Sequence, residues 1–148
     1  MKSVIRYVYV LRLENGGFYV GGTRHLANRL AKHWAKGGAM ATRASRPVAV
    51  EKVFQFEDGL CGKGLIHRRL EVFIASEYAE RHGIARVKGA KHGRGWDSVP
   101  TRNDLRFIRR SRAFFRRAEG QRWLASVRES DLDEYPIFAR WRRAAGAG

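Results

Sequence analysis

The stretch from Tyr7 to His33 constrains the fold of this chain more than any other. A run of strand formers from Tyr7 to Leu13 precedes Asn15-Gly16-Gly17, and a second run extends from Phe18 to Val20. Two apolar runs that flank Asn and Gly predict a β-hairpin. Gly21-Gly22-Thr23 then ends the second strand and offers a hydroxyl that can cap a helix.

A helix is predicted directly after this hairpin. Leu26 and Leu30 are spaced to form its buried face. Arg29 and His33 are four residues apart, so their side chains share one face of the helix.

The length of the hairpin loop decides which strand residues share a face, because a shift of one residue turns every side chain over. A two-residue Asn15-Gly16 turn places Tyr9 and Tyr19 on opposite faces. A three-residue Asn15-Gly16-Gly17 loop pairs Glu14 with Phe18 and puts both tyrosines on one face. We favour the three-residue loop, because glycine at its third position adopts positive φ without a Cβ penalty.

The rest of the chain predicts an α+β fold with a small, three-stranded, mostly antiparallel sheet flanked by helices. Val48 to Phe56 is expected to be the third strand, after a basic loop from Lys36 to Pro47. Apolar residues recur at helical spacing from about Lys63 to His82, where Gly83 supplies a stop. Ile84 to Ala90 is expected to be extended, and His92 to Thr101 a loop.

Charge points to the class of partner. Thirty Lys and Arg against fourteen Asp and Glu give a net charge of +16. Such an excess indicates a polyanion, with nucleic acid favoured over an anionic membrane; an inert basic surface is the alternative. No apolar run approaches the roughly 20 residues of a membrane span. The single cysteine, Cys61, permits no internal disulfide, so we expect a cytoplasmic (intracellular) protein that does not bind membranes. The oligomeric state stays open.

Arginines dominate the chain beyond Pro100. Arg102 to Arg117 contains seven arginines and one acidic residue, Asp104, which is placed to cap a helix. The outward side of this helix suits a phosphate backbone, although a solvated face on a packed helix explains it equally. Gly120 is expected to separate a second short helix. The residues that we predict to bind nucleic acid are Lys36, Arg43, Arg46, Arg106, Arg110 and Arg117.

Two phenols, a guanidinium and an imidazole near one surface suit the binding of a phosphate group. These four groups belong to a longer set of spaced positions. The set consists of Tyr9, Tyr19-Val20-Gly21, Thr23, Arg29 and His33, followed by Gly38-Ala39 to Thr42, Arg46-Pro47 and Phe56. They closely resemble a GIY-YIG nuclease domain. Tyr7 stands where the family has a glycine and lies on the strand face of Tyr9, so it is an alternative active-site phenol.

The resemblance implies a divalent-metal-dependent endonuclease that hydrolyses phosphodiester bonds, most readily in DNA. It implies a catalytic domain over residues 1–92, and the change of composition beyond Pro100 predicts that residues 93–148 are a basic helical extension packed on or beside it. The alternative is a non-catalytic nucleic-acid-binding module or assembly factor that retains the nuclease fold.

The resemblance also implies roles for single residues. Tyr9 would act as the general base or align it, Arg29 would stabilise the transition state, and Tyr19 and His33 would position phosphate and water. A phenol can be a base at neutral pH only if nearby cations lower its pKa.

A metal-binding glutamate is expected on a later helix, and Glu71 is our choice for Mg²⁺ or Mn²⁺. A salt bridge from Glu71 to His67 or Arg68 is the alternative explanation of its position. Glu77 and Glu80 are further candidates for the metal ligand. The other histidines (His25, His67, His82 and His92) lack zinc-ligand spacing and are expected at the surface.

Overall fold

A five-stranded mixed sheet lies at the centre of the computed structural model, which describes residues 4–35, 38–61 and 64–132. The strand order is β6-β2-β1-β3-β7. The strands are β1 (Val4–Leu13), β2 (Phe18–Thr23), β3 (Pro47–Asp58), β6 (Val87–Lys88) and β7 (Arg128–Glu129); β4 (Leu60–Cys61) and β5 (Gly64–Leu65) pair separately. The helices are α1 (Leu26–Trp34), α2 (Met40–Ala44), α3 (Ile66–His82), the 3₁₀ turn η1 (Ile84–Arg86), α4 (Arg102–Arg116) and α5 (Ala118–Ser126).

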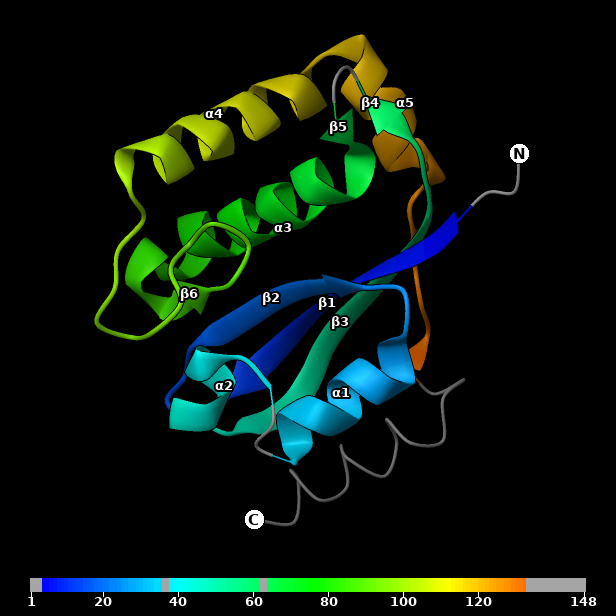
Figure 1. The fold of residues 1–148 in the computed structure, drawn as a ribbon. Coiled ribbons are helices and arrows are strands. Elements are labelled where there is room, and N and C mark those ends of the chain that lie inside the picture. Colours follow the sequence, from blue (N-terminus) through cyan, green and yellow to red (C-terminus); the bar gives the residue numbers. More distant parts are fainter. Residues whose placement is uncertain (1–3, 36–37, 62–63, 133–148) are drawn as a thin grey trace.

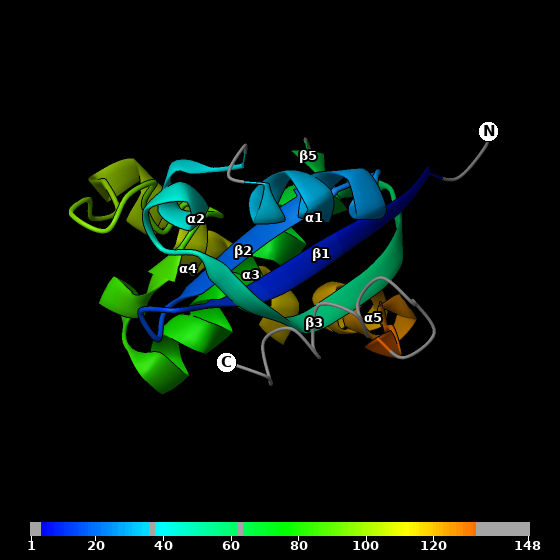
Figure 2. The ribbon, with the colours of Figure 1, turned by 90° about the horizontal axis from the view of Figure 1, so that it is seen from below.

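Helices cover both faces of this sheet. α1 and α2 lie on one face and α3 on the other, with α4 stacked outside α3 (Figures 1 and 2). No helix in the described part of the chain is long and apolar enough to cross a membrane.

The sheet is larger than the three-stranded antiparallel sheet predicted. β1, β2 and β3 form the expected antiparallel centre. The prediction missed β6, which pairs parallel to β2, and β7, which pairs antiparallel to β3. Both added strands are two residues long, so they carry no alternation that a sequence could reveal. Their pairing depends on the path of the chain after α3 and α5.

The hairpin loop has the predicted length but begins one residue earlier. Leu13 N–H donates to the Gly17 carbonyl over 2.9 Å, so the loop is Glu14-Asn15-Gly16. Gly16 has a φ of +82°, as the third position requires. This shift changes the pairing by two residues, so Leu11 pairs with Tyr19 and Tyr9 with Gly21. Tyr9 and Tyr19 therefore still share a face.

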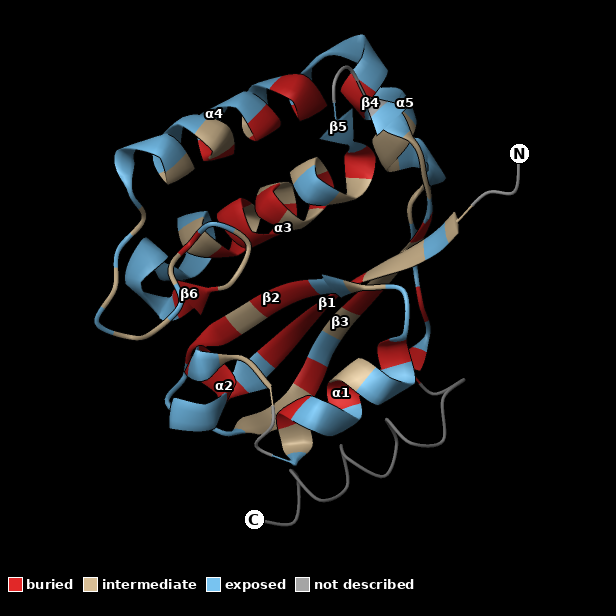
Figure 3. Ribbon diagram, viewed as in Figure 1, coloured by how far each residue is buried: buried red, intermediate tan, exposed pale blue. Residues whose placement is uncertain are grey.

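Two hydrophobic clusters hold the layers together (Figure 3). Val8 and Val10 of β1 pack against α3, while Tyr9, Leu11 and Leu13 pack against α1. The two clusters follow from strand alternation, because successive side chains point to opposite faces. Phe114 and Phe115 of the C-terminal helices belong to the α3 cluster. The division of the chain at residue 92 stays a prediction.

Three local expectations need correction. The segment predicted as a loop after α1 contains the short helix α2. The extended segment expected from Ile84 begins with a 3₁₀ turn and is a strand only at Val87–Lys88. Gly120 lies inside α5 and does not separate two helices. The residue is glycine because its Cα packs on the backbone of Phe114 and Phe115, where a Cβ would clash. The break between α4 and α5 lies at Arg117.

Arg112 joins α4 to α3 through charged groups. Its guanidinium donates to Ser76 Oγ at 2.7 Å and pairs with Glu77 at 3.2 Å and Glu80 at 2.8 Å. We expect Arg112→Met to lower the free energy of unfolding by about 1–3 kcal/mol, because Ser76 and the two carboxylates lose a charged donor. Urea denaturation measures the loss, with the exposed Arg116→Met as control. Equal midpoints for the two variants would contradict this role.

Candidate active site

The candidate site straddles an open edge of the sheet. β6 pairs with β2 only at Phe18 and Tyr19, so on the side away from β1 the end of β2 has no strand beside it in the described residues. Gly21 and Gly22 lie at this end. A Cβ on Gly21 would lie 2.5 Å from the Tyr9 hydroxyl oxygen, and a Cβ on Gly22 would clash with Glu71 Oε2. Because neither glycine has a side chain, groups from both faces approach the same stretch of backbone.

A chain of hydrogen bonds fixes Tyr9 and His33 on the α1 face. Thr42 Oγ1 donates to the Ala39 carbonyl at 2.9 Å, so it accepts from His33 Nδ1–H, also at 2.9 Å. His33 Nε2 is then left to accept the Tyr9 hydroxyl proton over 2.7 Å. Tyr9 is fully buried and His33 is 1% exposed, so water does not compete for these bonds.

Burial decides the protonation of this pair. It lowers the pKa of His33 to about 4, helped by the charge of Arg29. Burial also raises the pKa of Tyr9, as does Tyr19, while the hydrogen bond and charge of Arg29 act in the opposite direction. The expectation that nearby cations would lower the pKa of Tyr9 is therefore wrong, because desolvation of the buried phenol outweighs the effect of Arg29. Both groups are neutral at pH 7.

Arg29 and Tyr19 complete this side of the site. The Tyr9 and Tyr19 rings lie 6.3 Å apart, and Tyr19 and His33 lie 5.1 Å apart, between centroids. A hydrogen bond with Tyr9 raises the pKa of Arg29, so its guanidinium stays charged. Arg29 is partly exposed, and it can therefore offer N–H donors to an anion from outside.

Glu71 approaches from α3 on the opposite face. Its carboxylate forms no hydrogen bond or ion pair with any residue that the structure describes. The predicted alternative, a salt bridge to His67 or Arg68, is absent from those residues; His67 Nδ1 instead lies 2.6 Å from Asp58 Oδ2. The Glu71 charge contributes to raising the pKa of Tyr9 and of Tyr19, which reflects its closeness to both phenols.

The Glu71 carboxylate has the chemistry that a divalent cation requires. Burial raises its pKa to about 7, although Arg6, Arg68 and Lys91 act against this effect. An unpartnered, partly buried carboxylate gains most from a cation. No group of three or more His, Cys, Asp or Glu side chains that could hold a metal occurs in the described residues. Glu71 would thus hold an ion with few protein ligands, which suits Mg²⁺, an ion that usually keeps several waters.

Most of the other predicted residues lie outside this centre. Arg43, Arg46, Arg106, Arg110 and Arg117 are exposed, and their part in binding stays a prediction. Lys36 falls outside the described residues. Glu77 and Glu80 pair with Arg112. His92 is 1% exposed, so the expectation of a surface residue is wrong for it.

Sequence reasoning missed the structural task of Thr42 and the closeness of Gly38 to His33. A Cβ on Gly38 would clash with His33 Nδ1. Both residues fall in the run that resembles the nuclease family, but their contacts depend on how α2 folds back onto α1. Lys91, which lies near Glu71, carried no signal in the sequence.

The two glycines predict different effects for the same substitution. Gly21→Ala is expected to destabilise the fold by about 1–3 kcal/mol, because the added Cβ would clash with the fully buried Tyr9 ring, which cannot move aside. Gly22→Ala meets only the flexible end of Glu71, so we expect little change in thermal stability. For the endonuclease that the family resemblance implies, we expect a higher Mg²⁺ requirement for cleavage. Melting curves and Mg²⁺ titrations of cleavage measure both effects. Identical behaviour of the two variants would contradict the proposed position of Glu71.

Tyr7 and Tyr9 can be told apart by removing one hydroxyl at a time. Tyr9 bonds to His33, whereas Tyr7 is partly exposed and packs on the margin of the α1 cluster. For the endonuclease that the family resemblance implies, we expect Tyr9→Phe to lower the cleavage rate by about 10²-fold, in the range of positioned proton-transfer groups. Tyr7→Phe is expected to leave the rate within a few-fold of the parent. The reverse order would identify Tyr7 as the active phenol.

A family model described as "GIY-YIG catalytic domain" matches residues 5–59. This range includes Tyr9, Tyr19, Arg29 and His33 and ends before Glu71.

Several curated relatives carry the name "UPF0213 protein". One from Streptococcus pneumoniae is 35% identical over 66 residues, which is 43% of this chain and 67% of the relative. Another from Bacillus cereus is 40% identical over 50 residues, or 34% of this chain and 52% of the relative. One from Bacillus pumilus is 44% identical over 48 residues, which is 32% of this chain and 49% of the relative. The chain thus spans about half the length of two of these relatives. No solved structure matches it.

Proposed function

The chain belongs to the GIY-YIG family, and from that premise we propose that it is an endonuclease that hydrolyses phosphodiester bonds with the help of a divalent cation, with DNA as its substrate. One observation carries the proposal. A neutral Tyr9–His33 pair and the Arg29 guanidinium lie on one side of the open β2 edge, and the unpartnered Glu71 carboxylate lies on the other. A phosphate at this edge can contact both sides.

Arg29 would bind the phosphate that is cut. Its planar guanidinium can donate two N–H groups to non-bridging oxygens, and its charge offsets the negative charge that grows in the transition state. Tyr19 lies beside it and can donate its hydroxyl to the same group. These contacts position the phosphorus atom next to Tyr9.

Tyr9 and His33 would move the proton of the attacking water. The Tyr9 hydroxyl already donates to His33 Nε2. Once substrate binding brings a water molecule against this buried oxygen, the phenol can accept a proton from the water as its own proton passes to the imidazole. Thr42 holds the ring in the required orientation. This relay avoids a phenolate, which burial makes costly at Tyr9. Burial and Arg29 also lower the pKa of His33, so the imidazolium that forms would depend on the negative charge of the bound phosphate.

Glu71 would hold the cation, Mg²⁺ or Mn²⁺. When bound, such an ion polarises the phosphate and stabilises the leaving 3′ oxygen. The net charge of +16 supports binding to a polyanionic substrate.

Incubation with labelled single-stranded, duplex and flap DNA and with RNA, in Mg²⁺ or EDTA, tests the function. We expect cutting only with Mg²⁺, and more of DNA than of RNA. Tight binding without any cutting would favour a nucleic-acid-binding module. Affinity that is lost on truncation after Thr101, but unaffected by changes at Tyr9, Arg29 and Glu71, would favour an assembly factor.

A further inference from the structure

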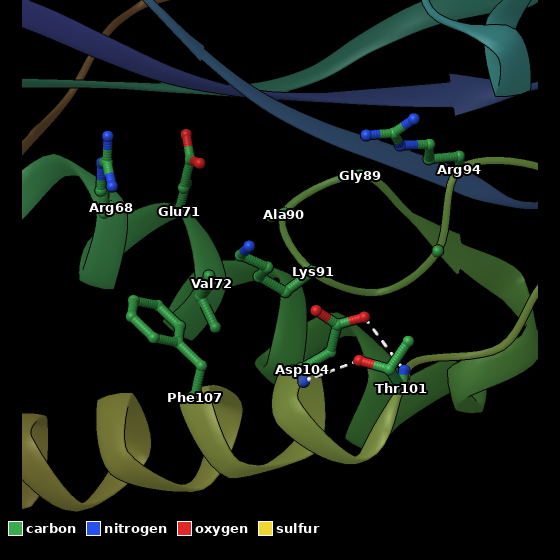
Figure 4. A pocket seen from close by; sticks show the side chains of 11 residues that line it. Arg68, Glu71, Val72, Gly89, Ala90, Lys91, Arg94, Thr101, Asp104 and Phe107 are labelled. Carbon is green, nitrogen blue, oxygen red and sulfur yellow. Dashed lines mark hydrogen bonds between the residues drawn. The ribbon is translucent and has the colours of Figure 1, made fainter.

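A cavity of about 550 Å³ opens beside Glu71. It lies between α3, the segment from Gly89 to Arg94 and the start of α4 (Figure 4). Arg68 and Lys91 line it next to Glu71. The second carboxylate in its wall, Asp104, accepts from Thr101 N–H at 3.0 Å as part of a helix cap, and is already occupied. The cavity therefore presents, next to the candidate catalytic carboxylate, positive charge from Arg68 and Lys91 that forms no ion pair within the part of the chain that the structure describes.

The turn that carries Lys91 has an unusual backbone. Gly89, Ala90, Lys91 and Gly93 have φ values of +80°, +48°, +68° and +107°. Ala90 and Lys91 are the two residues other than glycine with positive φ in the described part of the chain. This conformation is unfavourable for residues with a Cβ, and it persists where the surroundings enforce it, often at functional sites.

Hydrogen bonds enforce the turn. Gly89 N–H donates to the Gly93 carbonyl and His92 N–H to the Gly89 carbonyl, both at 2.9 Å. The buried His92 ring donates from Nδ1 to the Ala90 carbonyl at 2.8 Å. Lys91 at the tip is exposed and makes none of these bonds with its side chain. The turn therefore does not need a lysine at position 91.

The turn is also fixed to the active-site strand. β6 pairs Lys88 with Tyr19, and Gly89 follows at once. A Cβ on Gly89 would clash with the Val20 carbonyl and would lie 2.9 Å from the Tyr19 ring. Movement of the turn would thus disturb Tyr19, so the position of Lys91 relative to the candidate site is set by the sheet.

Lys91 lies close to Glu71 without pairing with it. Its charge counteracts the burial that raises the pKa of Glu71. No ion pair within 4 Å joins Lys91 or Arg68 to Glu71 among the residues described. Figure 4 shows the Lys91 ammonium turned into the space between the turn and Glu71. This space can admit an anion.

We propose that Lys91 and Arg68 bind the phosphate next to the one that is cut, so that the nucleic-acid backbone runs from Arg29 past Glu71 into this cavity. The inference rests on the proposed function for the identity of the anion. It assigns to Lys91 a positioning role, because the ammonium holds a neighbouring phosphate and the reacting group lies at Arg29.

Binding in EDTA tests this site without any cutting. Fluorescence anisotropy with a labelled single-stranded oligonucleotide compares the parent with Lys91→Met, Lys91→Arg and Lys52→Met. Lys52 is the charge-matched control, because it lies on β3 beside Glu129, 4.0 Å away. We expect Lys91→Met to weaken binding several-fold and to lower the slope of log K against log salt by about 0.7–0.9, the value for one phosphate contact. Lys91→Arg is expected to keep the affinity and the salt slope of the parent.

The backbone conformation supplies a second test. Lys91→Gly removes the ammonium and also relieves the positive φ, so its melting temperature is expected to rise. If Lys91 had only a structural role, Lys91→Gly would be more stable than the parent and its KM would be unchanged. We expect Lys91→Gly to be more stable than the parent and to have a raised KM with kcat nearly unchanged.

The outcomes separate this proposal from the function itself. Parent-like binding and salt slopes for both Lys91→Met and Lys91→Gly would overturn the phosphate site, as would equal losses for Lys91→Met and Lys52→Met. If the parent shows no cleavage, and the Lys91 variants nevertheless lose one phosphate contact in binding, the phosphate site stands and the nuclease proposal fails. If the parent cuts and Lys91 is without effect, only the site is wrong.

Discussion

Glu71→Gln is expected to reduce Mg²⁺-dependent cleavage by about 10²-fold or more, since the amide cannot replace the charge of the carboxylate toward a divalent cation. The amide keeps the size of the side chain, so the contact with the β2 edge persists. Single-turnover cleavage at saturating substrate measures the effect, with the exposed Glu51→Gln on β3 as control. Parent-like rates for Glu71→Gln would show that the cation, if one is needed, is held elsewhere.

The same substitution changes how stability depends on pH. The ordinary pKa of glutamate is 4.5, and burial raises that of Glu71 to about 7. Between these pH values the folded protein binds more protons than the unfolded chain, so Glu71 lowers the free energy of unfolding as pH rises, by at most about 3 kcal/mol. His33 acts in the opposite direction as pH rises from about 4 to 6.5. Subtracting the Glu71→Gln curve from the parent curve therefore isolates Glu71.

Mg²⁺ provides the check on that difference. An ion bound at Glu71 stabilises the folded state and holds the carboxylate ionised, so the parent's melting temperature is expected to rise with Mg²⁺ near pH 7. Glu71→Gln is expected to show no such rise. Equal Mg²⁺ shifts in both proteins would place the ion at another site.

Arg29→Ala is expected to slow cleavage by about 10²–10³-fold, the usual loss when one electrostatic stabiliser of a transition state is removed. Arg29→Lys is not expected to restore the rate, because an ammonium cannot bind a phosphate through two parallel N–H groups. The exposed Arg24→Ala, just before α1, removes the same charge and serves as control. Equal rates for the Arg24 and Arg29 variants would show that Arg29 contributes no more than general surface charge.

A spectroscopic measurement checks the position of Arg29 separately from activity. Its charge helps to lower the pKa of His33. NMR titration of His33 in Arg29→Ala is expected to give a higher pKa than in the parent. An unchanged pKa would contradict the closeness of the two groups.

Sequence patterns predicted the centre of the fold because its signals are local. Alternation in β1 and the glycines after Asn15 predict the hairpin, and the spacing of Leu26 and Leu30 predicts α1. The start of the loop was missed by one residue, because both Gly16 and Gly17 can adopt positive φ. Gly17 instead lies in contact with Trp96, where a Cβ would clash. That contact joins residues almost eighty positions apart.

The other side of the site depends on contacts that no local pattern encodes. The placement of Glu71 at the β2 edge requires that Gly22 lack a side chain, and the turn at Lys91 requires the two-residue strand β6. The protonation of Tyr9 was also predicted wrongly. The sequence shows that a cationic residue, Arg29, lies near Tyr9. Only the fold shows that the Tyr9 hydroxyl is fully buried and that the effect of burial on its pKa outweighs the charge of Arg29.

Product analysis in ¹⁸O-labelled water tests the hydrolytic centre most directly. The parent protein with Mg²⁺ and a labelled DNA oligonucleotide is predicted to give 3′-hydroxyl and 5′-phosphate ends, with one ¹⁸O atom in each new phosphate. No product is predicted in EDTA, and Glu71→Gln is predicted to form product at least about 10²-fold more slowly than the parent. The absence of cutting with Mg²⁺, or cutting that persists at the same rate in EDTA, would contradict a centre built on Tyr9, Arg29 and Glu71.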